Sequence, residues 1–264
     1  MCLPFLIVGW IIHPKLSLPP STPYLVKTLG KRLSKGIISL FVAAFVFFLT
    51  PFFLFYGEIS SVLKFQVAFT AAILALIAGF LAWSGREIKN VKVLALVSVL
   101  GSLSAALRLP FAALPSFQPC TFIIICAGYA LGPAAGFLVG TLTVVISNLA
   151  LGHGPWTIYQ IMGWGLAGAL AWPLRKVLEG SRWEWAALTL YGGLWGYVYG
   201  VITNLSFWLY FMQPTLEAFL IAEAASIWFD TVHAISNIVF LSLLGSRTVR
   251  FLYGFVGRFP DLKP

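Results

Sequence analysis

Residues 65–84 read FQVAFTAAILALIAGFLAWS, a run that contains no charged side chain. An α-helix rises about 1.5 Å per residue, so about 20 apolar residues cross the roughly 30 Å hydrocarbon core of a bilayer. Residues 37–56 read IISLFVAAFVFFLTPFFLFY and repeat the pattern. The two runs predict neighbouring transmembrane helices with short polar segments between them.

The composition of the whole chain is that of a membrane protein. Of its 264 residues, 60% are hydrophobic and 9% are charged, and the mean hydropathy is +0.94. The 17 basic and 8 acidic residues are too few to cover a water-soluble surface, so most of the outer surface must face lipid. The net charge is +9, but the basic residues stand in short clusters between apolar runs, which favours membrane topology over nucleic-acid binding.

The same span length, applied to the rest of the chain, gives six further spans. The predicted fold class is an all-α integral membrane protein with eight spans, in which two additional N-terminal helices precede a six-helix core. The predicted segments are a cytoplasmic or interfacial part at 1–36, the two additional helices within 37–92, the core at 93–246 and a basic tail at 247–264. The core spans are expected at 93–107, 119–131, 134–151, 157–174, 185–212 and 217–244.

The distribution of basic residues predicts the orientation in the membrane. Lysine and arginine accumulate in the N-terminal segment, in the links at 86–92 and 175–182 and in the C-terminal tail. With eight spans, only Lys64 and Arg108 of the 17 basic residues fall on the opposite side. By the positive-inside rule, both termini of this multi-pass protein of the cell membrane are expected to be cytoplasmic.

No motif for a cofactor, a metal or catalysis is present. The three cysteines form neither a CxxC pair nor an even-numbered disulfide framework. A GxSxG turn, an HExxH helix and a Walker A loop are all missing from the sequence. The chain is therefore predicted to have no catalytic residues, and any active transport would depend on ATPase partners. An intramembrane enzyme that uses His233 with Asp230, or His153, and a purely structural membrane subunit are the alternatives.

Small residues recur at helical spacing in the predicted spans, and short side chains let transmembrane helices approach closely. The two GxxxGxxxG patterns at 132–140 and 192–200 are interpreted as internal packing. A third stripe can pack internally or can dock a partner helix. It consists of Ser98, Gly101, Ser102, Ala105 and Ala106.

The last predicted span carries a stripe of polar side chains. Its members are spaced by 3, 4, 3 and 4 residues, which at 100° per residue places them within an arc of about 80°. An aspartate at the centre of a membrane helix costs roughly 2.5 to 3.5 kcal/mol on insertion scales, so such groups are candidates for function. Two interpretations are open, a lining of a ligand cavity and a hydrogen-bond network between helices. Arg108 and His233 are the expected partners of Asp230. The stripe consists of Glu223, Ser226, Asp230, His233 and Asn237.

Further polar and aromatic residues are expected at the external side. Arg108 ends the third span there, and the segment ALPSFQPCT follows it. GHGPWT at 152–157 closes the fifth span, and loops rich in glycine and proline can cap a cavity. Arg108 could instead snorkel to the interface, and Trp156 could anchor it. The candidate substrate-binding residues are Arg108, Gln118, Asn148, His153, Trp156, Tyr159, Gln160, Asn204, Asp230, His233 and Asn237.

Four stretches within positions 91–246 together resemble the substrate-binding S component of energy-coupling factor (ECF) vitamin transporters. They read VLALVSVLGSLSAALR, ALPSFQPCT running into YALGPAAGFLVG, NLALGHGPWTIYQIMGWGLAG and WFDTVHAISN. The resemblance implies a six-helix membrane protein that binds a vitamin or similar micronutrient near the external surface. It also implies docking onto a transmembrane coupling subunit and two cytoplasmic ATPase subunits.

The resemblance also suggests a docking face and a cargo. The typical docking face of the family falls here on Ser98, Ser102 and Ala106. GHGPWT and WFDTVHAISN are most similar to the branch associated with cobalamin or a corrinoid precursor. Riboflavin, queuosine precursors and other aromatic micronutrients are the alternative cargoes. The two additional helices within 37–84 depart from the common plan of the family.

Overall fold

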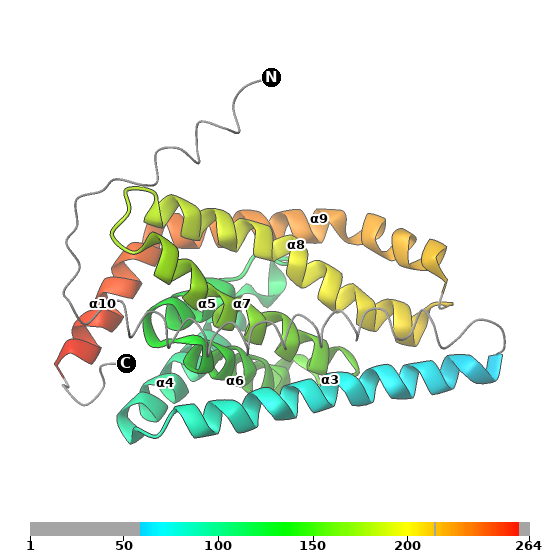
Figure 1. The fold of residues 1–264 in the computed structure, drawn as a ribbon. Helices are drawn as coiled ribbons and strands as arrows, with labels where there is room; N and C mark the ends of the chain where they lie inside the picture. Colours follow the sequence, from blue (N-terminus) through cyan, green and yellow to red (C-terminus); the bar gives the residue numbers. More distant parts are fainter. Residues whose placement is uncertain (1–58, 214, 259–264) are drawn as a thin grey trace. The chain divides into compact units, whose positions relative to one another are not determined.

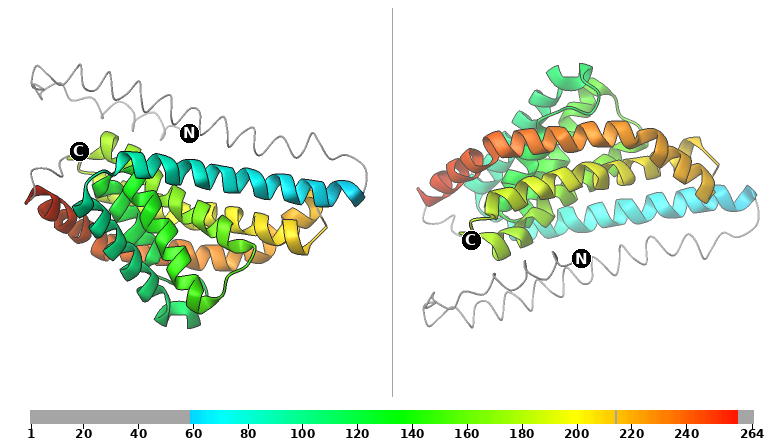
Figure 2. Two further views of the ribbon diagram at one scale, coloured as in Figure 1. Left: turned by 90° about the horizontal axis from the view of Figure 1, so that it is seen from below. Right: turned by 90° about the horizontal axis from the view of Figure 1, so that it is seen from above.

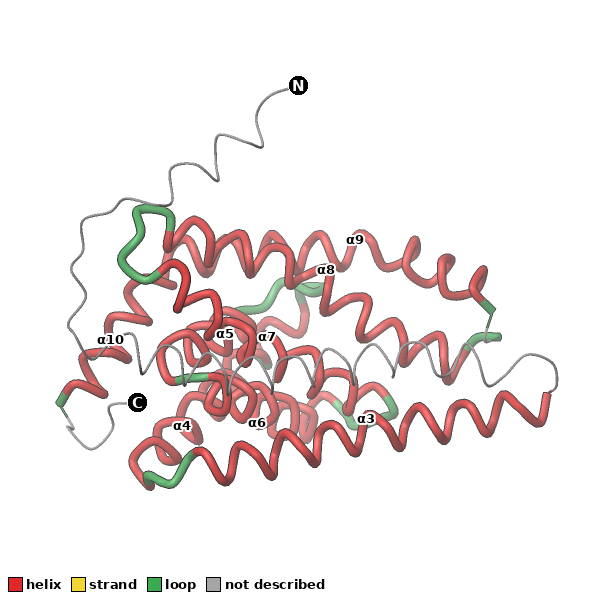
Figure 3. Tube along the Cα trace, in the orientation of Figure 1, coloured by secondary structure: helices red, strands yellow, loops and turns green. Residues whose placement is uncertain are grey.

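The computed structural model describes residues 59–213 and 215–258, which belong to one unit of the chain, Gly57–Pro264. Every regular element in these ranges is a helix, and most of the joining loops are short (Figure 3). The predicted span at 37–56, the segment 1–36 and residues 259–264 lie outside the described residues. The seven long helices are α3 (Ile59–Glu87), α4 (Val91–Arg108), α5 (Cys120–Leu131), α6 (Pro133–Leu151), α7 (Trp156–Leu178), α8 (Glu184–Phe211) and α9 (Leu216–Phe240).

The helical membrane fold predicted from the apolar runs is confirmed. Four described segments are long and apolar enough to cross a membrane: Gln66–Glu87, Val91–Ala113, Pro133–Leu151 and Leu216–Gly257. α7 and α8 have 23 and 28 residues, and their many tryptophan, tyrosine and glycine residues make them less apolar. The count of eight spans is not confirmed, because one of the eight lies outside the described residues and α5, α7 and α8 are not among these four segments.

Several helices extend beyond the apolar runs that predicted them, because polar residues cap their ends. α3 continues past both ends of the 65–84 run. At the start of α4, the side chain of Asn90 accepts a hydrogen bond from the backbone N–H of Lys92 at 2.9 Å. At the start of α9, Thr215 accepts one from Ala218 at 3.2 Å. Such caps satisfy N–H groups that have no partner within the helix.

α5 differs most from the span predicted for it. It has 12 residues, so it is about 18 Å long and too short to cross the bilayer alone. Every residue from Cys120 to Ala130 is buried, and α4, α6, α7 and α10 (Ser246–Gly257) pack around the helix. The run at 119–131 is therefore apolar because it forms the centre of the core rather than a surface in lipid.

The last predicted span continues without a break into the basic tail. α9 passes through a π-helical turn, η2 (Leu241–Gly245), into α10. The combined segment has 42 residues and would measure about 63 Å if straight, twice the thickness of the hydrocarbon core. α10, which carries Arg247 and Arg250, therefore reaches beyond the hydrocarbon.

α5, α6 and α7 meet where glycines take the place of larger side chains. Gly136 lies against the backbones of Gly128 and Gly168, so a Cβ atom at any of the three would collide. Gly140 lies in the same way against the backbone of Trp164. Gly132, in contrast, has a φ of 104° and ends α5 in a conformation that favours glycine. Within the pattern at 132–140, Gly136 and Gly140 therefore pack internally, as predicted, whereas Gly132 forms a turn.

α8 and α9 lie side by side as an antiparallel pair (Figure 2). Gly196, at the centre of the pair, lies against the backbone of Ala234. Gly200 also faces α9, where Asp230 covers it, and Gly192 faces Leu241, the first residue of η2. The prediction that the pattern at 192–200 packs internally is therefore confirmed.

α3, the second of the additional N-terminal helices, is an integral part of the core. It packs along α6 and α7 at one side of the bundle (Figure 1). Phe80 stacks on Phe137 of α6 with ring centroids 4.5 Å apart, and Phe69 stacks on Tyr159 of α7 at 6.3 Å. Aromatic stacking adds to the free energy gained from burial of these large rings.

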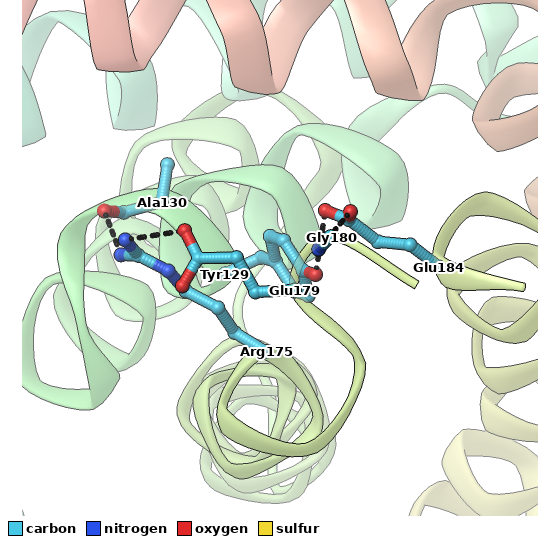
Figure 4. Close-up of polar contacts among 6 residues, drawn as sticks. All are labelled: Tyr129, Ala130, Arg175, Glu179, Gly180 and Glu184. Carbon is cyan, nitrogen blue, oxygen red and sulfur yellow. Dashed lines mark hydrogen bonds and ion pairs between the residues drawn. The ribbon is translucent and has the colours of Figure 1, made fainter. Parts of the chain in front are cut away.

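The basic links at 86–92 and 175–182 and helix α10 lie at the same end of the bundle (Figure 1). Arg175 forms an ion pair with Glu179 at 2.9 Å and donates a hydrogen bond to the carbonyl of Ala130 at 3.3 Å (Figure 4). Its guanidinium also lies over the ring of Tyr253 in α10, 4.6 Å from the centroid. The fold thus gathers the groups that the positive-inside rule assigns to one side of the membrane.

Glu184 closes the turn between α7 and α8 (Figure 4). Its carboxylate accepts hydrogen bonds from the hydroxyl of Tyr129 and from the backbone N–H of Gly180, both at 2.9 Å. Gly180 has a φ of 79°, which glycine adopts without strain. One oxygen of this buried carboxylate therefore bonds to α5, and the other bonds within the turn.

Candidate functional site

The side chain of Arg108 is the centre of a buried polar cluster. It projects from the last turn of α4 and is 8% exposed. Its Nε donates a hydrogen bond to Oε1 of Gln118 at 3.1 Å, and its Nη1 donates to Oγ of Ser147 at 2.7 Å and to Oδ1 of Asn148 at 2.8 Å. Its Cζ lies over the ring of Trp164, 4.7 Å from the centroid. Neutral acceptors and an aromatic face therefore hold this cation, which does not snorkel to the interface.

Gln118 belongs to the loop that follows the short helix η1 (Pro110–Ala113). Its backbone N–H donates to Oγ of Ser236 at 2.9 Å, and the Ser236 hydroxyl donates to the carbonyl of Gln118 at 3.0 Å. Ser236 is fully buried on α9. These two bonds fix the loop against α9 and place the Gln118 side chain beside Arg108.

Asn148 connects Arg108 to the GHGPWT segment. Its Nδ2 donates to Oε1 of Gln160 at 2.8 Å and to Oγ1 of Thr157 at 3.3 Å. Thr157 also accepts a hydrogen bond from the backbone N–H of Gly154 at 3.2 Å, and its Oγ1 lies 3.4 Å from Nδ1 of His153. The external segments that were expected to converge are therefore joined by hydrogen bonds.

His233 is connected to the same cluster through Thr121. Its Nε2 lies 2.8 Å from Oγ1 of Thr121, and Nε1 of Trp164 donates to that oxygen at 2.9 Å. Trp164 can only donate to this oxygen, whereas the donor and acceptor roles of Thr121 and His233 depend on the tautomer of the imidazole. Tyr199 stacks on Trp164 at 4.6 Å and meets the edge of His233 at 4.9 Å. Trp164, which lies against the guanidinium of Arg108, is thus connected through Tyr199 to His233.

Asp230 belongs to a separate group of polar side chains between α8 and α9. Its Oδ2 accepts a hydrogen bond from Ser226 at 2.7 Å, and Nδ2 of Asn204 donates to the same hydroxyl at 2.7 Å. Asp230 therefore finds its donor on its own helix, and the expected pairing with Arg108 or His233 is wrong. Among the described residues, no three histidine, cysteine, aspartate or glutamate side chains gather as a metal ion would require.

The remaining candidates lie outside the cluster around Arg108. Asn237 donates to the carbonyl of Gly192 at 2.9 Å, and its buried Oδ1 has no hydrogen-bond partner. Tyr159 faces α3, and its hydroxyl is buried and unpaired. Trp156 is 38% exposed and covers Gly154.

Sequence analysis missed several residues of the cluster: Thr121, Ser147, Trp164, Tyr199 and Ser236. Trp164 could have been found, because residues 157, 160 and 164 are spaced by 3 and 4 and share one helix face. Tyr199 carried no such signal, since it stands among many aromatic residues of α8.

Residues 92–255 match the family described as ECF transporter, substrate-specific component. The match covers more than half of the 264-residue chain and includes helices α4 to α9 almost entirely. No curated protein and no solved structure matches the chain. A substrate-specific component is the substrate-binding subunit of a membrane transporter and is not an enzyme, which removes the alternative of an intramembrane enzyme. The chain therefore belongs to the family of substrate-specific components of ECF transporters.

Proposed function

We propose that the protein captures a vitamin or related micronutrient at the external face of the cell membrane and passes it inward with the help of ATP-driven partners. The partners are a transmembrane coupling subunit and two cytoplasmic ATPase subunits. We assign substrate binding to the Arg108 cluster. By this name we mean Arg108, Gln118, Thr121, Ser147, Asn148, Thr157, Gln160, Trp164, Tyr199 and His233.

The observation that supports this assignment is the meeting of five helices and two loops at Arg108. Hydrogen bonds connect α4, α6, α7 and α9, the start of α5 and both glycine- and proline-rich loops. Ligand sites usually combine apolar and aromatic walls with a few polar groups that orient the ligand. Here Trp164 and Tyr199 provide the rings, and the partly exposed amides of Gln118 and Gln160 provide donors and acceptors.

Of the five residues in the polar stripe of α9, only His233 belongs to the Arg108 cluster. His233 contacts Thr121 inside the cluster. Asp230 with Asn204, and Asn237 with Gly192, bridge α8 and α9 instead. These contacts favour a ligand role for His233 and a structural role for Asp230 and Asn237.

We place the docking face for the coupling subunit on α4. Ser98, Ser102 and Ala106 are exposed, whereas Gly101 and Ala105 are buried, with Gly101 against Leu142 of α6. The small-residue stripe thus has one side that packs internally and one side that is open to a partner helix. Short exposed side chains permit the close approach on which helix association in membranes depends.

Cargo and topology complete the proposal. The proposed cargo is cobalamin or a corrinoid precursor, and this choice rests on the resemblance of GHGPWT and WFDTVHAISN alone. Riboflavin and queuosine precursors are the competing cargoes. Eight spans with both termini in the cytoplasm put the Arg108 cluster toward the external side.

The experiment that tests the proposal is identification of the bound molecule by mass spectrometry of the full-length protein purified in detergent. Uptake of that molecule is then measured in cells with and without the coupling and ATPase subunits. We expect a micronutrient bound by the isolated protein, and uptake only with all partners present. Protein that carries no small molecule and binds neither cobalamin, riboflavin nor a queuosine precursor would contradict the proposal.

A further inference from the structure

Arg108 has an unused donor group. Its Nε and Nη1 donate to Gln118, Ser147 and Asn148, which are all neutral. Nη2 makes no hydrogen bond to any residue of 59–213 or 215–258, and it is not among the fully buried unpaired polar atoms. One corner of the guanidinium is therefore both free and accessible.

The protein has few acidic groups that could neutralise this cation. The sequence contains 8 acidic residues. The one ion pair between described residues joins Glu179 to Arg175 at the C-terminal end of α7. Glu184 is used by Tyr129, and Asp230 accepts from Ser226. The described acidic residues are Glu87, Glu179, Glu184, Glu217, Glu223 and Asp230, while Glu58 and Asp261 lie outside the described residues.

A buried cation without a counter-charge is unfavourable, because neutral hydrogen bonds restore only part of the lost hydration. The face of Trp164 lowers the cost further, but it leaves the charge itself uncompensated. Trp164 covers one face of the guanidinium, so an additional acceptor is best placed at its edge, where Nη2 is free. Carboxylates and phosphates are the groups whose geometry fits such an edge best.

We propose that the substrate carries a carboxylate or phosphate group and that this group pairs with Nη2 of Arg108. The inference rests on the function proposed for the Arg108 cluster and names the chemical class of its substrate. The counter-charge that the described residues do not provide then comes from the cargo. Selection between micronutrients follows from charge as well as from shape, because a neutral analogue leaves the cation unpaired.

The test compares ligands that differ in a single charged group, using the full-length protein in detergent. The pairs are riboflavin 5′-phosphate with riboflavin, biotin with its amide, and cobyric acid with cobinamide, together with the co-purified molecule and its neutral derivative. Affinities are measured by isothermal titration. We expect at least one charged member to bind at least tenfold more tightly than its neutral partner, a ratio that corresponds to about 1.4 kcal/mol.

Variants of Arg108 then test whether its guanidinium causes the preference for the charged ligand. Arg108→Gln should lose the preference, and Arg108→Lys should keep part of it, because lysine retains the charge without the planar fork. Arg182→Gln, which removes an exposed arginine beside Trp183, serves as the matched control and should bind like the wild type. If Arg108→Gln does not fold, Arg108→Lys alone decides, since a loss of charge preference there would contradict the proposal.

Thermal unfolding without ligand separates this role from a structural one. Arg108→Gln removes a buried charge but also the donors to Ser147 and Asn148, so its melting temperature is interpreted together with its affinity. A lower melting temperature with unchanged affinity would show that Arg108 is structural. Equal affinity for charged and neutral members, or no binding of any charged member, would also overturn the inference. Tight binding of a neutral micronutrient would leave the proposed transport function intact, whereas failure of that function would appear as no binding at all.

Discussion

Gly196 of α8 lies directly against the backbone of Ala234 in α9. A Cβ atom at position 196 would be 2.5 Å from the nitrogen of Ala234, which the rest of the helix holds in place. His233 precedes Ala234, so the same contact determines how far His233 stands from Thr121 on α5. The spacing of two helices and the geometry of the Arg108 cluster are therefore set at one point.

Gly196→Ala should destabilise the protein by about 1 to 3 kcal/mol, because the added methyl group has to push against backbone. Thermal unfolding in detergent measures the effect. Gly79→Ala in α3 is the control, since its methyl group would have no neighbour within 4 Å and alanine favours helix. Equal melting temperatures for the two variants would show that α8 and α9 can separate freely.

His233→Ala should weaken substrate binding by roughly 1 to 3 kcal/mol, the usual cost of removing a buried polar group that contacts a ligand, because Trp164 still donates to Thr121. Asp230→Asn should leave the affinity almost unchanged, because the amide oxygen can still accept from Ser226. Isothermal titration with the co-purified ligand compares the two. A larger loss for Asp230→Asn would move the binding site toward the group between α8 and α9.

Reporter fusions test the orientation that the basic residues predict. Fusions after Lys89 and at Pro264 should read cytoplasmic, and one at His153 should read external. A cytoplasmic reading at His153 would turn the Arg108 cluster inward and contradict the proposed capture from outside.

Ser102→Trp and Ala106→Trp should impair ATP-dependent uptake while substrate affinity stays close to that of the wild type. Both positions are exposed on α4, and a large ring there would hold a partner helix at a distance. Ala225→Trp, exposed on α9, is the matched control and should transport normally. Loss of binding together with transport would show that this face of α4 packs within the protein.

The parts of the fold that follow from local pattern could be predicted from sequence. Apolar length predicted the helices, and glycine spacing predicted that the pattern at 192–200 packs internally, because both depend on neighbours within one helix. The partner of that pattern, α9, was not predicted. The extent of α5 was predicted to within one residue, but its burial was not foreseen, because an apolar run looks the same whether protein or lipid surrounds it. The pairing of Asp230 was predicted wrongly, because a face shared on one helix does not say which helix lies opposite. Arg108 and the two loops were identified from chain order and turn residues, whereas Tyr199 depended on tertiary packing alone.

Because Phe80 stacks on Phe137 and Phe69 stacks on Tyr159, α3 cannot be removed without exposing rings of α6 and α7. The family match begins at residue 92, after the end of α3, yet α3 covers rings that belong to the matching part. Gln66 also donates to the carbonyl of Leu209 at 2.5 Å, and Thr70 bonds to Tyr210, so α8 too depends on this helix. The part of the chain that matches the family therefore begins later than the part that packs together, which includes α3. A fragment cut at residue 92 would place aromatic and polar surfaces in lipid that the intact chain keeps inside.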